Sequence, residues 1–151
     1  MPDISAYLKT KVHYIRTQEA ISELLEKRNI TEIRFTQNTK QVMLEFNYPL
    51  RQGQQTFKLG VRFMLELPEA ENEKERHQYR NQYYRALYYI LKSKFEAVEF
   101  GIREFAQEFL GDLVYHLPNG KTATIAEIIS PQIEKSITQG TSEVLMLPDQ
   151  T

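Results

Sequence analysis

Cysteine is absent from the 151-residue sequence, and so is any long apolar run. Without cysteine the chain cannot form disulfides, Cys-ligated zinc sites, iron–sulfur clusters or a thiol nucleophile. Its apolar runs fall short of the roughly 18 residues of a membrane span. The first residues, MPDISAYLKTKVHYIRTQ, lack the apolar core of a signal peptide. We therefore expect a cytoplasmic protein without a membrane partner.

The motifs of common catalytic and cofactor sites are also missing. The six glycines form neither G-x-G-x-x-G nor a phosphate-binding P-loop, and no G-x-S-x-G elbow is present. His13, His77 and His116 lie far apart, without the spacing of zinc-binding helices. The sequence thus predicts no catalytic residue, no metal ligand and no cofactor, and it favours a protein that is not an enzyme.

The composition indicates one folded domain. Hydrophobic residues make up 41% of the chain, which is enough for a core. The net charge of -1 does not mark the whole chain as a nucleic-acid binder. We expect a single α+β domain, 1–151. It would comprise an irregular start (1–16), a helix–three strands–helix body (17–112) and a C-terminal hairpin and helix (113–151).

Alternating apolar residues predict three antiparallel strands. In TEIRFTQ, QVMLEFNYP and TFKLGVRFMLELP, apolar side chains recur at every second residue, which is the period of a half-buried strand. Short turns separate these runs, so we expect a three-stranded meander with one apolar face. Pro49 is expected to end the second strand, because proline interrupts the hydrogen-bond ladder.

Helical periodicity lies on both sides of this meander. A first helix is expected over 17–29, with Thr17 as its N-cap. Over 84–109, apolar residues recur three and four residues apart, which predicts a long helix against the sheet. Gly101 interrupts the pattern, so we expect either one kinked helix or two helices joined there.

The last third of the chain predicts a short hairpin followed by a helix. LVYHLPNGKT contains the Pro-Asn-Gly signal of a turn between two short strands. Thr124 and Glu127 form a capping-box pattern, and Ser130 with Pro131 is expected to restart the helix. Gly140 is expected to end it. The apolar residues of the tail TSEVLMLPDQT are expected to pack onto the body.

The most unusual segment is RHQYRNQYYRALYYILKSK, residues 76–94. It holds five tyrosines, five Lys or Arg residues and no acid, whereas residues 95–112 hold one base and five acids. The two segments therefore carry net charges of +5 and -4. A helix dipole favours the opposite order, so helix electrostatics does not explain the pattern. The segregation indicates a surface that binds negative charge.

Interleaved rings and cations suit nucleic acid, because the cations neutralise phosphates and exposed rings stack on bases. We therefore expect a non-enzymatic nucleic-acid-binding accessory protein. The residues expected to bind are Arg76, Arg80, Arg85, Lys92, Lys94, Tyr79, Tyr83 and Tyr89. An acidic protein partner would suit them as well. A tyrosine-rich core helix with a solvated basic face would also give this pattern, without any binding.

Two other functions stay open. The chain could be a protein–protein interaction module, either an inhibitor or a homo-oligomeric assembly subunit, because the +5 and -4 segments could pair head to tail. It could also be a metal-dependent nuclease that uses clustered carboxylates. These carboxylates are Glu96, Glu99, Glu104, Glu108 and Asp112.

The second half of the chain carries a series of short motifs. An aromatic-R-A-L segment is followed by K-x-K-x-E-A-V-E-x-G-I, then by E-F-L and L-P-x-G-x-T. The matching residues are Arg85, Ala86, Leu87, Lys92, Lys94, Glu96, Ala97, Val98, Glu99, Gly101, Ile102, Glu108, Phe109, Leu110, Leu117, Pro118, Gly120 and Thr122. In these motifs the chain resembles a bacterial and phage-associated family without an established activity. The resemblance implies a phage or mobile-element setting and no mechanism.

The order helix, three strands, helix is also similar to that of double-stranded-RNA-binding domains. That likeness is one of topology only. The K-K-x-A-K motif that begins the second helix of those domains is absent here, so no residue role is carried over.

Overall fold

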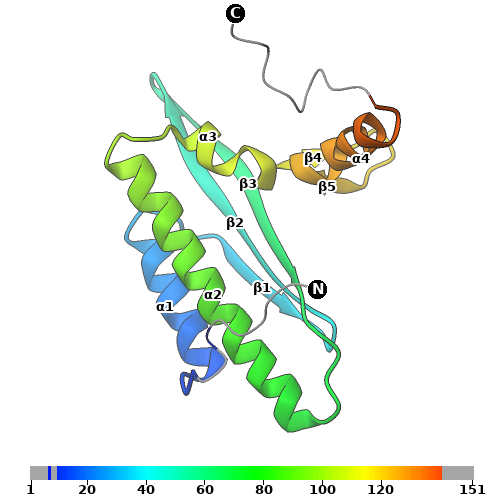
Figure 1. Ribbon diagram of the computed structural model, residues 1–151. Helices are drawn as coiled ribbons and strands as arrows, with labels where there is room; N and C mark the ends of the chain where they lie inside the picture. Colours follow the sequence, from blue (N-terminus) through cyan, green and yellow to red (C-terminus); the bar gives the residue numbers. More distant parts are fainter. Residues whose placement is uncertain (1–6, 8–9, 141–151) are drawn as a thin grey trace, which may run out of the picture.

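The computed structural model describes Tyr7 and residues 10–140, which form an α+β fold (Figure 1). Its helices are α1 (Tyr14–Glu26), α2 (Glu73–Glu99), α3 (Phe105–Phe109), the 3-10 turn η1 (Leu110–Asp112) and α4 (Ile125–Thr138). Its strands are β1 (Ile33–Gln37), β2 (Gln41–Gln52), β3 (Gln55–Glu66), β4 (Val114–His116) and β5 (Thr122–Thr124). The tail TSEVLMLPDQT, with its expected packing, lies outside the described residues.

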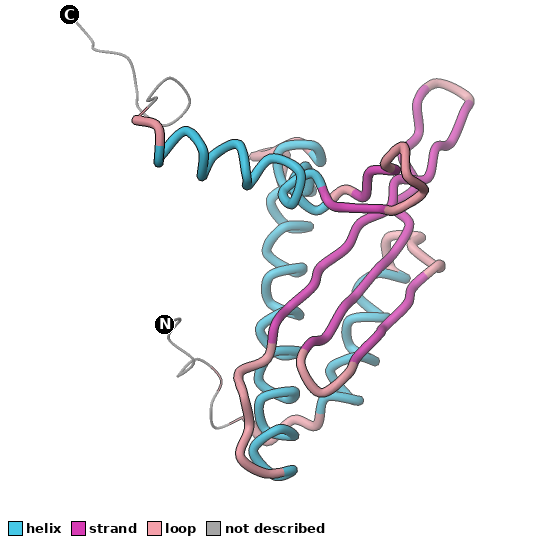
Figure 2. The backbone as a smooth tube through the Cα atoms, turned by 90° about the vertical axis from the view of Figure 1, so that its right-hand side faces the viewer, coloured by secondary structure: helices cyan, strands magenta, loops and turns pink. Residues whose placement is uncertain are grey.

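The predicted meander is confirmed. β1, β2 and β3 form one antiparallel sheet in that order. Along β2, Val42, Leu44 and Phe46 are buried, and each alternates with a less buried residue. Figure 2 shows α1 and α2 together on one side of this sheet. The period-two pattern of the sequence therefore marks the face that the helices cover.

Pro49 does not end its strand. β2 continues to Gln52, and Pro49 pairs with Lys58 of β3. The pairing of β1 with β2 extends only to Phe46, so Pro49 has no strand neighbour on the β1 side. Proline is tolerated on such a free edge. The long hairpin thus extends past β1, which leaves Phe57 exposed near its tip.

The core lies between the sheet and the two long helices. Its buried apolar residues are Ile21, Leu25, Ile30, Val42, Leu44, Phe46, Val61, Phe63, Leu67, Tyr84, Leu87, Leu91, Phe95 and Phe109. Full burial of one such side chain stabilises the fold by about 1.5–3 kcal/mol before conformational entropy is counted. These residues come mainly from β2, β3 and the two long helices, and Ile33 and Phe35 of β1 are partly buried against them.

The first helix begins three residues earlier than expected. His13 is its N-cap, and the ring Nδ1 accepts a hydrogen bond of 3.2 Å from the backbone N–H of Ile15. Thr17, expected at the cap, lies inside α1 and is fully buried. The prediction was wrong for two reasons. The ring nitrogen of His13 accepts a hydrogen bond at the helix start, and the small side chain of Thr17 packs in the interior of the fold.

Gly101 joins two helices, which was one of the two alternatives. Its φ of 72° is in the left-handed region, where glycine is favoured. The turn breaks the apolar stripe, so Ile102 is 74% exposed although it continues the helical spacing in the sequence. Phe105 and Phe109, on α3, return to the core region.

The C-terminal hairpin packs on the face of the sheet that the helices leave free. Leu113 forms an isolated antiparallel bridge with Val61. A Cβ atom on Gly60 would lie 3.4 Å from the Cβ of Val114, so the missing side chain at position 60 allows β4 to approach the sheet. The predicted Pro-Asn-Gly hairpin, β4 with β5, is confirmed.

α4 is one helix, which corrects the expected restart at Ser130 and Pro131. The Ser130 hydroxyl donates to the backbone O of Ala126 at 2.6 Å, and the helix continues through Pro131 to Thr138. The predicted capping box at its start and the left-handed Gly140 after its end are both confirmed. None of the described helices is long and apolar enough to cross a membrane.

Candidate functional site

All eight residues expected to bind a partner lie on α2, but most of them contact other parts of the chain. Arg76 forms an ion pair with Glu73, one turn before it. The Tyr79 hydroxyl donates to a carboxylate oxygen of Glu75 at 2.8 Å, and this hydrogen bond raises the pKa of Tyr79. Tyr83 packs against the hydrophobic core. Glu73 and Glu75, in the first turn of α2, therefore bind Arg76 and Tyr79, which were expected to bind a partner.

Arg80 is held by uncharged groups. Its guanidinium lies 5.4 Å from the ring centroid of Tyr14 and donates to the backbone O of Asn38 at 3.4 Å. Its Nε atom is buried without a hydrogen-bond partner among the described residues. Arg80 thus joins α2 to α1 and to the β1–β2 turn, and only part of its side chain is accessible.

The two lysines meet acids from the negative segment. Lys92 lies 4.0 Å from a carboxylate oxygen of Glu96. The ammonium of Lys94 donates to the backbone O of Glu108 at 2.6 Å and lies 3.8 Å from carboxylate oxygens of Glu108 and Asp112. Burial raises the pKa of Asp112, although the charge of Lys94 opposes this. The turn at Gly101 therefore brings part of the -4 segment onto the end of the +5 segment.

Arg85 and Tyr89 contact aromatic rings and each other. The guanidinium of Arg85 lies over the rings of Tyr88 and Tyr89, at 5.3 and 5.0 Å, and it donates to the Tyr89 hydroxyl at 3.2 Å. Tyr7 stacks on Tyr89 with ring centroids 5.6 Å apart. Within the described part of the chain, no carboxylate lies at ion-pair distance from Arg85. The expected eight-residue strip is thus divided: Arg85 lies among tyrosines, whereas the side chain of Lys92 is 46% exposed beside Glu96.

Two histidines that are distant in the sequence come together. The rings of His13 and His77 lie 4.7 Å apart, beside Tyr14. No group of three or more His, Asp or Glu residues in the described ranges is arranged to hold a metal ion. The pairing of α1 with α2 creates this contact, and no local spacing in the sequence signals it.

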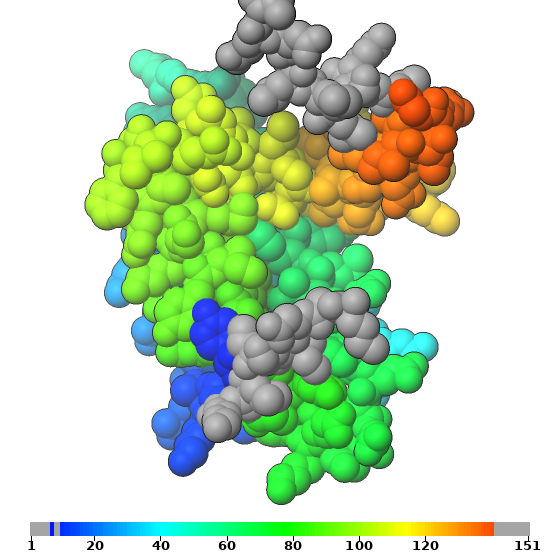
Figure 3. Space-filling view, viewed as in Figure 1, coloured from blue at the N-terminus to red at the C-terminus, as the bar shows by residue number. Residues whose placement is uncertain are grey.

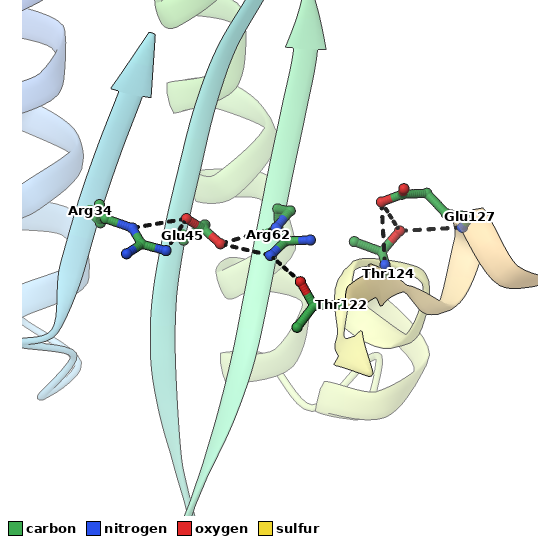
Figure 4. A network of polar contacts seen from close by, with 6 residues as sticks. All are labelled: Arg34, Glu45, Arg62, Thr122, Thr124 and Glu127. Atoms are coloured by element: carbon green, nitrogen blue, oxygen red, sulfur yellow. Dashed lines mark hydrogen bonds and ion pairs between the residues drawn. The ribbon is translucent and has the colours of Figure 1, made fainter. Parts of the chain in front are cut away.

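The open face of the sheet carries a polar network (Figure 4). Arg34 donates to one carboxylate oxygen of Glu45, at 2.6 and 3.0 Å, and Arg62 donates to the other at 3.0 Å. Arg62 also donates to the hydroxyl of Thr122 on β5 at 3.0 Å. Burial raises the pKa of Glu45, but these hydrogen bonds outweigh it and hold the pKa below its ordinary value. The network fastens the C-terminal hairpin to the sheet.

Beside this network lies a hollow of about 490 Å³, bounded by the sheet and by β4. Its charged side chains are paired: Lys58 and Asn47 both donate to Glu32, and Arg34 binds Glu45. These contacts satisfy both carboxylates with neighbouring donors. The hollow is therefore a seam between the sheet and the hairpin, and both of its carboxylates accept hydrogen bonds from neighbouring side chains.

α4 presents a row of exposed isoleucines. The four isoleucines Ile128, Ile129, Ile133 and Ile137 are all exposed, the last of them by 63%. No residue of α4 is buried. The helix is anchored at its start, where the Cβ of Ala126 lies 3.5 Å from the Cβ that Gly111 would carry. Figures 1 and 2 show the rest of α4 pointing away from the sheet.

The exposed isoleucines of α4 also border a hollow. Ile128, Ile129 and Ile133, with Gln132 and Ser136, line a mainly apolar hollow of about 370 Å³. These residues follow the i, i+4, i+8 spacing of one helix face. We call these five residues and Ile137 the isoleucine face. In Figure 3, α4 forms the orange edge of the molecule.

No family model, no curated protein and no solved structure matches the chain.

The isoleucine face is the feature that sequence reasoning missed. The sequence of α4 places isoleucine at 125, 128, 129, 133 and 137, which is a readable amphipathic pattern. The expected restart at Pro131 divided this pattern into two short pieces. Read as one helix, it has a single apolar stripe and no described element packed along it.

Proposed function

We propose that this chain is a non-enzymatic protein-interaction module that docks onto another protein chain through the isoleucine face of α4. The single observation that carries the proposal is a 14-residue helix with four exposed isoleucines and no buried residue. Contiguous exposed apolar surface on a folded protein marks interaction sites. An amphipathic helix that lays its apolar face on a partner is a recurrent mode of recognition.

The energetics of α4 support this function. A helix of this length is marginal in water on its own, because helix formation has a costly nucleus. α4 contacts the body chiefly through η1 and β5 at its first turns. A partner that covers the isoleucines would supply the tertiary packing that the distal turns lack.

Position-specific photo-crosslinking in the producing cells tests this proposal. The photoreactive residue benzoyl-phenylalanine replaces either Ile133, in the isoleucine face, or Glu134, on the opposite side of the same helix. We expect covalent adducts from position 133 to exceed those from position 134 by several-fold. Equal yields from the two positions, or no adduct from either, would contradict the proposal.

A second candidate function is nucleic-acid binding, as an accessory protein of a phage or mobile element. The observation in its favour is Arg85, whose guanidinium is oriented by two tyrosine rings and meets no carboxylate among the described residues. Such a group can bind a phosphate through charge-assisted hydrogen bonds. Four of the five expected cations are engaged within the chain, so this candidate ranks second.

Titration with short single- and double-stranded DNA and RNA across a salt series tests the second candidate. We expect Arg85→Ala to weaken binding and to make its salt dependence shallower, whereas Arg51→Ala in the β2–β3 hairpin should not. Absence of binding at low salt, or binding that is flat with salt, rules it out.

A further inference from the structure

β1 is an edge strand of the three-stranded sheet, and no other described strand pairs with its outer side. The opposite edge differs, because Leu113 forms a bridge with Val61 of β3. β1 contains no proline, and its pairing with β2 continues from end to end without a bulge. It therefore lacks two of the devices by which proteins keep an exposed edge from pairing with another strand.

The pairing of β1 with β2 determines which backbone groups of β1 face outward. At the turn between the two strands, the N–H of Asn38 donates to the backbone O of Gln41 at 3.0 Å. In an antiparallel pair, residues that bond to the neighbouring strand alternate with residues whose N–H and C=O point away from it. Counted back from position 38, the residues of β1 that point away from β2 are Ile33, Phe35 and Gln37. Their backbone groups are thus available to a further strand.

A hollow of about 430 Å³ lies beside this edge, between α1 and β1. Ile15 on its α1 wall is 49% exposed. A strand added to β1 would direct alternate side chains into this space, because successive side chains of a strand point to opposite faces. The residues that line the hollow are Phe35 of β1 and Ile15, Gln18, Glu19, Ser22 and Glu23 of α1.

Two carboxylates make the hollow negative. Glu19 and Glu23 lie one turn apart on α1, and like charges at i and i+4 repel each other. Neither forms an ion pair with another described residue, and the described lining of the hollow includes no Lys, Arg or His. A positively charged partner would relieve the repulsion. A second copy paired edge to edge would instead bring its own Glu19 and Glu23, so that like charges would meet.

The spacing of these carboxylates matches that of a strand. α1 runs antiparallel to β1: Tyr84 stacks on Tyr14 at the start of α1, and its hydroxyl donates to the side chain of Gln37 at the end of β1, at 3.0 Å. The helix rises about 6 Å from Glu19 to Glu23. Residues i and i+2 of a strand, on the same face, are about 6.6 Å apart. Two cations separated by one residue can therefore reach both carboxylates.

We propose that β1 binds an extended segment of another protein, which joins the sheet as an additional antiparallel strand. The segment has the pattern apolar-x-Lys/Arg-x-Lys/Arg, with the apolar residue beside Ile15 and Phe35 and the two cations facing Glu19 and Glu23. In such strand addition, backbone hydrogen bonds supply affinity and alternate side chains supply specificity. This inference goes beyond the proposed function, because it uses a surface separate from the isoleucine face.

NMR on the isotope-labelled full chain, with the synthetic peptide acetyl-Thr-Val-Thr-Lys-Thr-Lys-Thr-amide as the probe, gives the first test. We expect saturable shift changes at β1 and slower hydrogen exchange at the amides of Ile33, Phe35 and Gln37. The amides of Arg34 and Thr36, which already face β2, should keep their exchange rates. Absence of a saturable change at β1 with millimolar peptide overturns the proposal.

Methylation of the peptide backbone distinguishes strand pairing from attraction of charge alone. A methyl group on the backbone nitrogen of the first lysine removes a donor that faces β1, and it should abolish binding. A methyl group on the nitrogen of the next threonine, which points away from β1, should leave binding intact. Equal binding of the two methylated peptides contradicts strand addition.

Reversal of charge tests the partner's chemistry. Glu19→Lys combined with Glu23→Lys should weaken binding of the probe at least about tenfold and permit binding of a peptide with glutamate in place of both lysines. The matched control is Glu69→Lys with Glu71→Lys, which makes the same charge change at two exposed sites. Equal weakening by both double variants overturns the site. Ile133→Lys should not affect the probe, so failure here leaves the role of α4 untouched.

Discussion

Thr17 and Thr124 have different structural roles: one is buried inside a helix and the other caps one. Thr17 is fully buried inside α1, and its hydroxyl has no hydrogen-bond partner among the described residues. Thr124 is the N-cap of α4: its hydroxyl accepts from the backbone N–H of Glu127 and contacts the Glu127 carboxylate. The capping role of Thr124 can be predicted from the sequence, because Thr124 and Glu127 form a capping-box pattern. The burial of Thr17 depends on tertiary packing, which no local sequence pattern indicates.

The substitution of valine for each threonine should therefore have opposite effects. Thr17→Val keeps the shape and removes an unpaired buried hydroxyl, so it should leave stability unchanged or raise it by up to about 1 kcal/mol. Thr124→Val removes a cap and should lower stability by about 1 kcal/mol. Urea unfolding of both variants measures the difference. A loss of stability in Thr17→Val that equals that of Thr124→Val would contradict the assignment.

Lys94 and Asp112 provide a test of the contact between the basic and acidic segments. Burial raises the pKa of Asp112, and the nearby ammonium of Lys94 lowers it. Lys94→Met should raise the pKa of Asp112 further, because it removes that opposing charge. An NMR titration of the Asp112 carboxyl group measures the shift. Lys92→Met serves as the control, and an Asp112 pKa that is unchanged in Lys94→Met would contradict the contact.

At the scale of elements, periodicity predicted where strands and helices lie but not how far each extends. The three strands and the hairpin were placed correctly because alternation and the Pro-Asn-Gly turn are local signals. Pro49 and Pro131 were each expected to stop an element, yet β2 and α4 continue through them. Proline is tolerated on a strand edge without a neighbour, and whether Pro49 has such a neighbour depends on the tertiary structure. α4 continues through Pro131 without a backbone N–H donor at that position.

The candidate site was predicted less well than the fold. Five cations without an acid in sequence were expected to be free, but acids from before residue 76 and after residue 94 reach several of them in space. The pairs Arg76–Glu73 and Lys92–Glu96 follow from helical spacing, as does the contact of Arg85 with Tyr89. The contacts of Lys94 with Glu108 and Asp112 do not, because they depend on the turn at Gly101.

Glu45 should control how firmly the C-terminal hairpin is held to the sheet. Glu45→Gln leaves Arg34 and Arg62 without their shared carboxylate and should lower stability at neutral pH by about 1–2 kcal/mol. The pKa of Glu45 is lower in the folded chain than in the unfolded chain. Its contribution is therefore complete above the unfolded pKa and is lost as the pH falls through the folded pKa.

Chemical denaturation from pH 7 down to pH 3 measures this dependence. The stability difference between the native chain and Glu45→Gln should shrink at the acidic end of the series. Glu66→Gln, on the same sheet, is the control, because no ion pair of Glu66 is found among the described residues. A difference that stays constant with pH would contradict the role assigned to the Glu45 carboxylate.

At the scale of the whole molecule, the chain consists of a covered sheet and an uncovered helix. α1, α2 and α3 bury the apolar side of the meander, and the polar network on its other side binds the hairpin from which α4 extends. Every other long helix has buried residues, whereas α4 has none. In the function we propose, the body presents α4, and a partner covers the isoleucine face.

Hydrogen–deuterium exchange at the backbone amides of residues 128–138 tests this claim most directly. The account predicts slower exchange of these amides in lysate of the producing cells than in the dilute purified chain, and loss of that protection in Ile133→Lys, because a covered helix opens less often than a free one. Exchange that is equal in the lysate and in the purified chain, for the native chain as for Ile133→Lys, would contradict it.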